Sequence, residues 1–156
     1  MKSNRAWVGL ILSIAGSGCS SASVAVTEVL NEANCTGLEA GIHAVSLEDV
    51  AKLKGRRMIG SNAPPPDTSS DAPRLIAISR GEQPTAGYGL ELVSASTANG
   101  DAIEVIVNWR EPPADTVVAQ VITRPCLVLG LPDAATGPVS VSLDDGSPLG
   151  SLPPIH

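Results

Sequence analysis

Apolar residues fall on every second position along several short stretches in the second half of the chain. Ile103, Val105, Val107 and Trp109 follow this spacing, which places them on one face of a β-strand. Turn-forming residues separate such stretches at regular intervals, as in all-β domains. The predicted strands are Leu75–Ser79, Gly89–Ser96, Ala102–Trp109, Val117–Thr123, Cys126–Leu131 and Val139–Leu143.

The sequence Asn99-Gly100-Asp101 between two of these stretches predicts a tight hairpin, because Asn and Gly tolerate the positive φ angles of such turns. Short strands joined by turns predict a mostly β protein. We therefore expect an antiparallel β-sandwich or barrel-like domain.

The first half of the chain contributes fewer elements. Val24–Leu30 is rich in β-branched residues and predicts a first strand. Ser46 followed by Glu48 and Asp49 is a helix-start pattern and predicts a single short helix, packed at one end of the sandwich. The proline-rich stretch Gly60–Pro73 predicts a loop. Residues 24–147 are thus expected to form one β-rich domain, and residues 148–156 a trailing tail.

The N-terminus has the order of a targeting signal: two cationic residues, an apolar stretch, then small residues ending in Cys19. This order resembles a bacterial lipobox, in which the cysteine is acylated and becomes the mature N-terminus. Residues 1–18 are predicted to be a signal peptide and residues 19–23 a lipidated cysteine with a short tether. Ser20 resembles an outer-membrane sorting signal, which predicts a lipid anchor facing the periplasm. Ordinary secretion, with cleavage after Ala22, is the alternative.

Composition narrows the functional classes. Ten Lys and Arg against sixteen Asp and Glu give a net charge of −6, and without a basic face no nucleic-acid partner is expected. The histidines are His43 and His156, and no nucleophile motif, phosphate loop or metal-ligand spacing accompanies them. The protein is therefore predicted to be a binding module and not an enzyme, with no cofactor and no metal.

Two cysteines remain once Cys19 is lipidated. In an oxidising compartment we expect Cys35 and Cys126 to form a disulfide. Two separately buried thiols are the alternative, because free cysteine is often a core residue.

Two proline-stiffened loops are the predicted partner-binding surface. In the first, Pro84 restrains a turn, Gly87 permits backbone geometry closed to other residues, and Tyr88 opens the next strand. Tyr88 is either an aromatic anchor for the partner or a brace that closes the end of the sandwich. The predicted binding residues of this loop are Gln83, Pro84, Thr85, Gly87 and Tyr88.

The second loop, Arg110–Asp115, is kept extended by two adjacent prolines. It serves either as a plain connection between strands or as a ledge for a partner. Its predicted binding residues are Glu111, Pro112 and Pro113.

Three stretches together resemble the protease complex subunit PrcB family, in its C-terminal domain: LIAISRGEQPTAGYGLELV, EVIVNWREPPAD and VVAQVITRPCLVLGLP. They span about Leu75 to Pro132. Ala86 and Cys126 depart from residues common in the family. The resemblance implies a small exported protein, often a lipoprotein, associated with an envelope or secreted protease and acting in its assembly or activity.

Two alternatives of other classes stay open. QPTAGY resembles the first binding loop of chagasin-like cysteine-peptidase inhibitors, and Arg124-Pro125 resembles part of their last loop. Against this, Cys126 stands where those inhibitors have an aromatic residue. The other alternative is a structural envelope lipoprotein without a protease partner.

Overall fold

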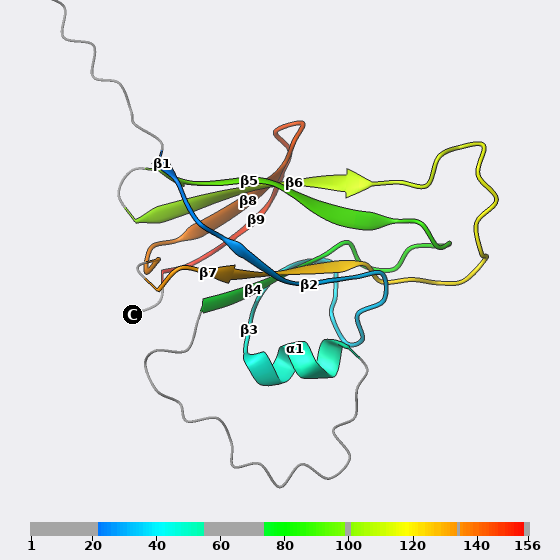
Figure 1. Cartoon of the computed structure of the whole chain (residues 1–156), viewed down its shortest axis with the longest axis horizontal. Helices are drawn as coiled ribbons and strands as arrows, with labels where there is room; N and C mark the ends of the chain where they lie inside the picture. Colours follow the sequence, from blue (N-terminus) through cyan, green and yellow to red (C-terminus); the bar gives the residue numbers. More distant parts are fainter. Residues whose placement is uncertain (1–21, 55–73, 99–100, 134, 155–156) are drawn as a thin grey trace, which may run out of the picture.

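The computed structural model describes residues 22–54, 74–98, 101–133 and 135–154. Nearly all regular structure in this part is β (Figure 1). The helix is α1, Leu47–Leu53. The strands are β1 Ala22–Ser23, β2 Thr27–Glu32, β3 Gly41–Val45, β4 Arg74–Ser79, β5 Gly89–Ala98, β6 Ala102–Arg110, β7 Cys126–Leu131, β8 Val139–Leu143 and β9 Pro148–Leu152.

These strands form two sheets that pack face to face, in the orders β1-β5-β6-β8-β9 and β2-β7-β4-β3. Neighbours are antiparallel except β6 and β8, which run parallel. The chain leaves the first sheet after β6, forms β7 in the second sheet, and re-enters as β8 in the direction of β6. The predicted fold class, a mostly β sandwich with one short helix, is confirmed.

The core between the sheets is aliphatic. Ile103, Val105 and Val107 of β6 are buried while Glu104 is exposed, as the two-residue period requires. Trp109 packs against the same cluster from a partly buried position. Each fully buried aliphatic side chain contributes roughly 1.5 to 3 kcal/mol.

The second sheet is covered on both faces, so buried and exposed residues do not alternate along its central strands. All residues of β7, and all of β4 except Arg74, are buried. One face meets the first sheet, and the other meets Val50 and Leu53 of α1. The helix therefore lies across a sheet face (Figure 1), and its predicted position at one end of the sandwich was wrong.

The start of the helix is as predicted. The Ser46 side chain accepts a hydrogen bond from the Asp49 amide, and the Asp49 carboxylate accepts one from the Ser46 amide, forming a capping box. These bonds hold the pKa of Asp49 below its ordinary value. Val50 and Leu53, three positions apart, then lie on the face turned toward the sheet.

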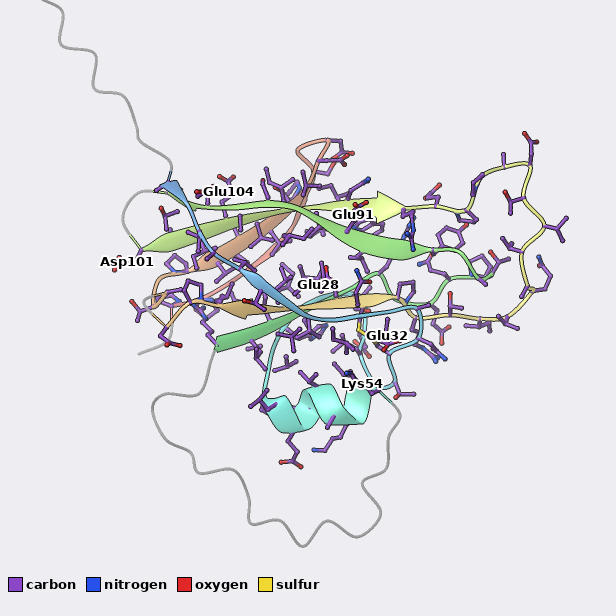
Figure 2. All side chains as sticks on the ribbon, viewed as in Figure 1. Glu28, Glu32, Lys54, Glu91, Asp101 and Glu104 are labelled. Carbon is purple, nitrogen blue, oxygen red and sulfur yellow. A yellow bond between two sulfur atoms is a disulfide. The ribbon has the colours of Figure 1, made fainter. Side chains whose placement is uncertain are left out.

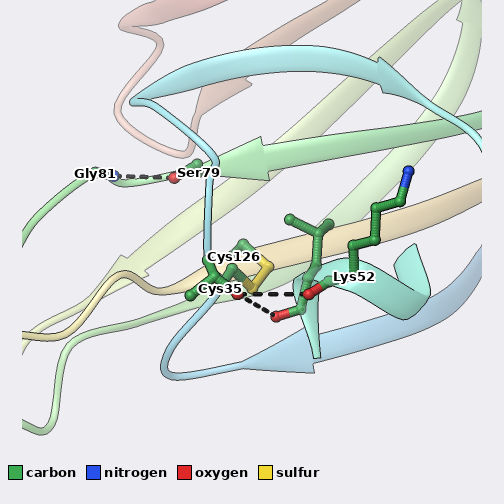
Figure 3. The surroundings of a disulfide bond; sticks show 7 residues. Cys35, Lys52, Ser79, Gly81 and Cys126 are labelled. Carbon is green, nitrogen blue, oxygen red and sulfur yellow. Dashed lines mark hydrogen bonds between the residues drawn. A yellow bond between two sulfur atoms is a disulfide. The ribbon is translucent and has the colours of Figure 1, made fainter. Parts of the chain in front are cut away.

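The predicted disulfide between Cys35 and Cys126 is present, and both residues are fully buried (Figure 3). Cys126 opens β7 opposite Glu32, the last residue of β2. The bridge thus ties the chain to the sheet just after β2 leaves it. Beside it, Thr36 Oγ1 donates to the carbonyl of Lys52, so the same point is also tied to the end of α1.

Strand positions near the N-terminus differ from the sequence expectation. The first long strand begins at Thr27, three residues later than predicted, and continues to Glu32. Ala22 and Ser23, expected in the tether, pair with Thr97 and Ser96 at the edge of the first sheet. The chain then crosses to the second sheet.

Two further expectations were wrong. The tail predicted from residue 148 instead starts with β9, which pairs with β8 and packs Leu149 and Leu152 against the core. Val117–Thr123 was predicted as a strand but has no sheet neighbour among the described residues, apart from a bridge at Thr123. Its β-branched residues favour extended chain, but a strand also needs a paired neighbour.

The hairpin predicted around Asn99 is consistent with the pairing of Ala98 and Ala102 across β5 and β6. Residues 99 and 100 themselves, the predicted signal peptide, Cys19, and the loop predicted from Gly60 to Pro73 lie outside the described residues. Among those described, no helix is long and apolar enough to cross a bilayer.

Candidate protein-binding site

The two predicted loops meet at one end of the sandwich, where β5 begins and β6 ends (Figure 1). A Cβ atom placed on Gly87 would lie 2.8 Å from Cβ of Pro112, and Gly87 has a φ of +97°. Both the close approach and the positive φ require glycine here. The structure therefore brings together two loops that are more than twenty residues apart in sequence.

The loops are joined by Arg80, which the sequence analysis did not single out. Its guanidinium carbon lies 4.8 Å from the ring centroid of Tyr88 and 4.5 Å from that of Trp109. Nη1 donates to the carbonyl of Arg110 at 3.0 Å, and Nη2 lies 2.5 Å from a carboxylate oxygen of Glu111. One cation thus contacts residues of both loops and of the strand beneath them.

Burial strengthens these contacts. The Arg80 side chain is 7% exposed, so its contacts with the two rings operate with little water, where a cation–π pair contributes about 2 kcal/mol. Within the described residues, Nε of Arg80 and Nε1 of Trp109 are buried without a hydrogen-bond partner. Arg80 with the rings of Tyr88 and Trp109 is called the Arg80 stack below. The Arg80 stack therefore depends on the ring contacts and on the bonds of the two Nη atoms.

Tyr88 is half-buried, with its ring beside the guanidinium of Arg80. Among the described residues its hydroxyl makes no hydrogen bond to backbone, the contact expected of a β-sandwich corner brace. The ring is held by a cation instead, and this leaves part of it open to solvent.

A third segment, residues 116–123, runs back from the tip of the second loop alongside the first; we call it the return segment. Gln83 and Thr123 exchange two backbone hydrogen bonds, of 2.8 and 3.0 Å. The Ala86 amide donates to the carbonyl of Ala119 at 3.0 Å. The Thr123 hydroxyl donates to the carbonyl of Thr85. The first loop is thus held between the second loop and the return segment.

Charges at this end are largely paired. Glu82 forms an ion pair with Arg124, directly after the return segment. Glu111 neutralises the buried Arg80. An open pocket of about 590 Å³ adjoins this end, lined by Gly37, Leu38, Glu39, Ala40, Gly81, Glu82 and Arg124.

The predicted binding residues divide by exposure. Those exposed to solvent are Pro84, Gly87, Glu111 and Pro113, and those half-buried are Gln83, Thr85, Tyr88 and Pro112. The exposed set forms a surface with two prolines, and the half-buried set supports it. Arg80 and the exposed apolar residues of the return segment belong to the same end and were missed. No local pattern marks a cation that stacks between rings from separate strands.

The residues considered for chemistry lie elsewhere. His43 is in β3, where its Nε2 is 3.1 Å from the carbonyl oxygen of Glu39. Within the described ranges, no three His, Cys, Asp or Glu side chains gather as metal ligands would.

The fold and this end together define a β-sandwich domain that presents joined loops at one end. Residues 74–132, from the start of β4 to just past β7, match the model of the PrcB C-terminal family. This confirms the resemblance seen in the sequence, over a stretch shorter than half of the chain. The matched stretch contains both loops, the Arg80 stack and the return segment. No curated protein and no solved structure matches the chain.

Proposed function

We propose that the protein is an exported, lipid-anchored binding module that serves as an accessory subunit of a cell-envelope protease complex. The PrcB C-terminal match supports the link to a protease complex. The order of features around Cys19 supports export and anchoring at the outer membrane, facing the periplasm. The partner contacts the loop end of the sandwich, and the lipid holds the module at the membrane.

One observation carries the proposal: the two loops are fixed against each other before any partner binds. Gly87 contacts Pro112, and Arg80 is bonded to the second loop while stacked on Tyr88 of the first. Prolines further limit the conformations open to both loops. A surface that is already ordered loses less entropy on docking, so a small area can bind usefully.

The test adds bulk at the loop end without touching its internal contacts. Ala114 is exposed at the tip of the second loop, and Thr136 is exposed in the connection from β7 to β8, at the opposite end of the sandwich (Figure 1). Tagged protein carrying Ala114→Trp or Thr136→Trp is purified from envelopes under gentle conditions, and copurifying proteins are identified by mass spectrometry. The melting temperature of each variant is measured alongside.

We expect a peptidase to copurify with the unmodified protein and with Thr136→Trp, and to be lost from Ala114→Trp at unchanged melting temperature. Absence of any peptidase from the unmodified protein would overturn the proposal and favour a structural lipoprotein. Retention of the peptidase by Ala114→Trp would show that the loop end is not the contact.

A peptidase inhibitor is the second candidate, supported by one feature of the structure. The bonds between Gln83 and Thr123 bring the QPTAGY stretch beside Arg124-Pro125, the two segments that resemble inhibitor loops. Against it, Cys126 is engaged in the disulfide. An assay with papain distinguishes the two: inhibition by the unmodified protein, relieved by Ala114→Trp, would favour the inhibitor.

A further inference from the structure

The return segment leaves backbone groups unpaired. Ala119 and Thr123 bond to the first loop through their backbones. Successive residues of an extended chain direct their amides and carbonyls to opposite sides, so Val118, Gln120 and Ile122 direct theirs away from that loop. Among the described residues, none of these three bonds to another backbone group, and the one side-chain contact is the Gln120 side-chain amide, which donates to the Val118 carbonyl at 3.5 Å. The outward backbone groups of these residues form a free edge of extended chain, to which another strand could pair.

Apolar side chains accompany this edge. Val117 is 100% exposed, Val121 52% and Ile122 64%. These three are half of the exposed large hydrophobic residues in the described part, and the other three are scattered over β2, α1 and β5. The stretch TVVAQVIT contains no charged residue and no proline, a composition that favours pairing with another strand.

The other sheet edges carry features that discourage such pairing. β2 presents the exposed carboxylates of Glu28 and Glu32, both labelled in Figure 2. β1 is two residues long, and β9 begins with Pro148. β3 lies beside β9, where Ile42 approaches Gly150. The return segment is unlike these edges, which indicates that its edge is used.

We propose that this edge binds an extended strand of a partner polypeptide by strand addition, and that the bound strand is rich in β-branched residues and free of acidic ones. Backbone groups along an edge bind another extended backbone, and Val121 and Ile122 offer apolar contacts beside it. This proposal rests on the proposed function for the identity of the partner, and it adds how that partner is bound.

The charge of the protein indicates which kind of strand binds at this edge. The protein has a net charge of −6, and Asp115 is exposed just before the return segment. A second copy of the chain would bring the same negative charge to the contact, whereas a neutral or lysine-flanked strand would be attracted. The occupant is therefore a strand of a different protein.

Substitutions at Gln120 test the edge directly. Gln120→Pro removes one outward amide that has no partner in the described structure, so the fold is retained while a strand can no longer pair there. Gln120→Ala is the matched control, because it also loses the side-chain contact with the Val118 carbonyl but keeps the backbone amide. The probes are two short synthetic peptides of alternating valine and threonine, one flanked by lysine and one by glutamate, followed through the backbone amide NMR signals of the whole protein.

We expect the lysine-flanked peptide to shift the amides of Val118, Gln120 and Ile122, and to bind about tenfold more tightly than the glutamate-flanked one. Gln120→Pro should weaken this binding by about tenfold or more, and Gln120→Ala by less than about twofold. Equal binding by Gln120→Pro and the unmodified protein would overturn the proposal. So would a dimer in sedimentation that Gln120→Pro dissolves, because the occupant would then be a second copy.

The outcome is independent of the copurification experiment. Peptide binding without a copurifying peptidase would contradict the proposed function and still support strand addition at this edge. A peptidase complex that assembles equally well with Gln120→Pro and Gln120→Ala would contradict strand addition at this edge and still support the proposed function.

Discussion

Loss of the disulfide should cost the domain a large part of its stability. Cys35 and Cys126 are 91 positions apart, so the bridge closes most of the folded domain into one loop. Both residues are fully buried in the cluster between the second sheet and α1. Reducing the bridge leaves two buried thiols and therefore removes the cross-link with little change in packing.

The magnitude follows from the length of the closed loop. In the chain-entropy model, a cross-link over a loop of this length stabilises the folded state by about 4.6 kcal/mol at 25 °C. Single domains unfold with roughly 5 to 15 kcal/mol, so this is a third or more of the total. With a urea dependence of about 2 kcal/mol/M, the unfolding midpoint should fall by roughly 2 M on reduction.

Urea unfolding of the mature protein, oxidised and reduced, measures this shift. Cys35→Ala combined with Cys126→Ala is the control for packing, and it should unfold at a slightly lower midpoint than the reduced protein because two buried sulfur atoms are lost. A shift below about 0.5 M would contradict the predicted stabilisation by the disulfide, since it corresponds to only about 1 kcal/mol. Alkylation of both thiols in denatured, unreduced protein would show that no bridge forms.

Three further predictions concern the anchor, the helix and the loops. Mass spectrometry of the mature protein should find an acylated Cys19 at the N-terminus, whereas an unmodified N-terminus at Ser23 would contradict lipidation. The pKa of Asp49 is held below its ordinary value of 3.8 by bonds from Ser46, so the stability that it contributes is present above pH about 4 and is lost as the pH falls through the lower, folded-state pKa. Asp49→Asn should flatten this acid loss of stability in urea titrations, and an unchanged profile would contradict the cause. Gly87→Ala should cost about 1 to 3 kcal/mol in thermal unfolding, because it strains a positive φ and pushes the two loops apart; an unchanged melting temperature would contradict the contact.

The strands that the sequence predicted well are those whose burial matches their pattern. β6 and β8 have one buried face, so Ile103, Val105, Val139 and Val141 mark them through strict alternation. β7 is buried on both faces and reads as an unbroken apolar run, and its bounds from Cys126 were predicted to the residue.

The elements that the sequence missed depend on neighbours distant in the chain. β9 contains Pro148 and Gly150 and has little strand character of its own, but pairing with β8 orders it. The return segment has strong strand character and no sheet neighbour in the described part. Local strand propensity alone therefore missed β9 and wrongly predicted a strand in the return segment.

The candidate site was predicted in part for the same reason. Prolines and Gly87 mark the two loops locally, and the clustering of loops at the end of a sandwich predicted that they lie together. The Arg80 stack was missed, because Tyr88 and Trp109 come from different strands and only the fold brings both rings to one cation.

Site-specific photo-crosslinking in intact cells tests whether the loop end contacts an envelope protease. A photoreactive residue replaces Ala114 at the loop end or, in a matched strain, Thr136 at the opposite end, and cross-linked products are identified by mass spectrometry. We expect a peptidase to be cross-linked from position 114 and not from position 136. The same product from both positions, or no peptidase from position 114, would contradict this contact.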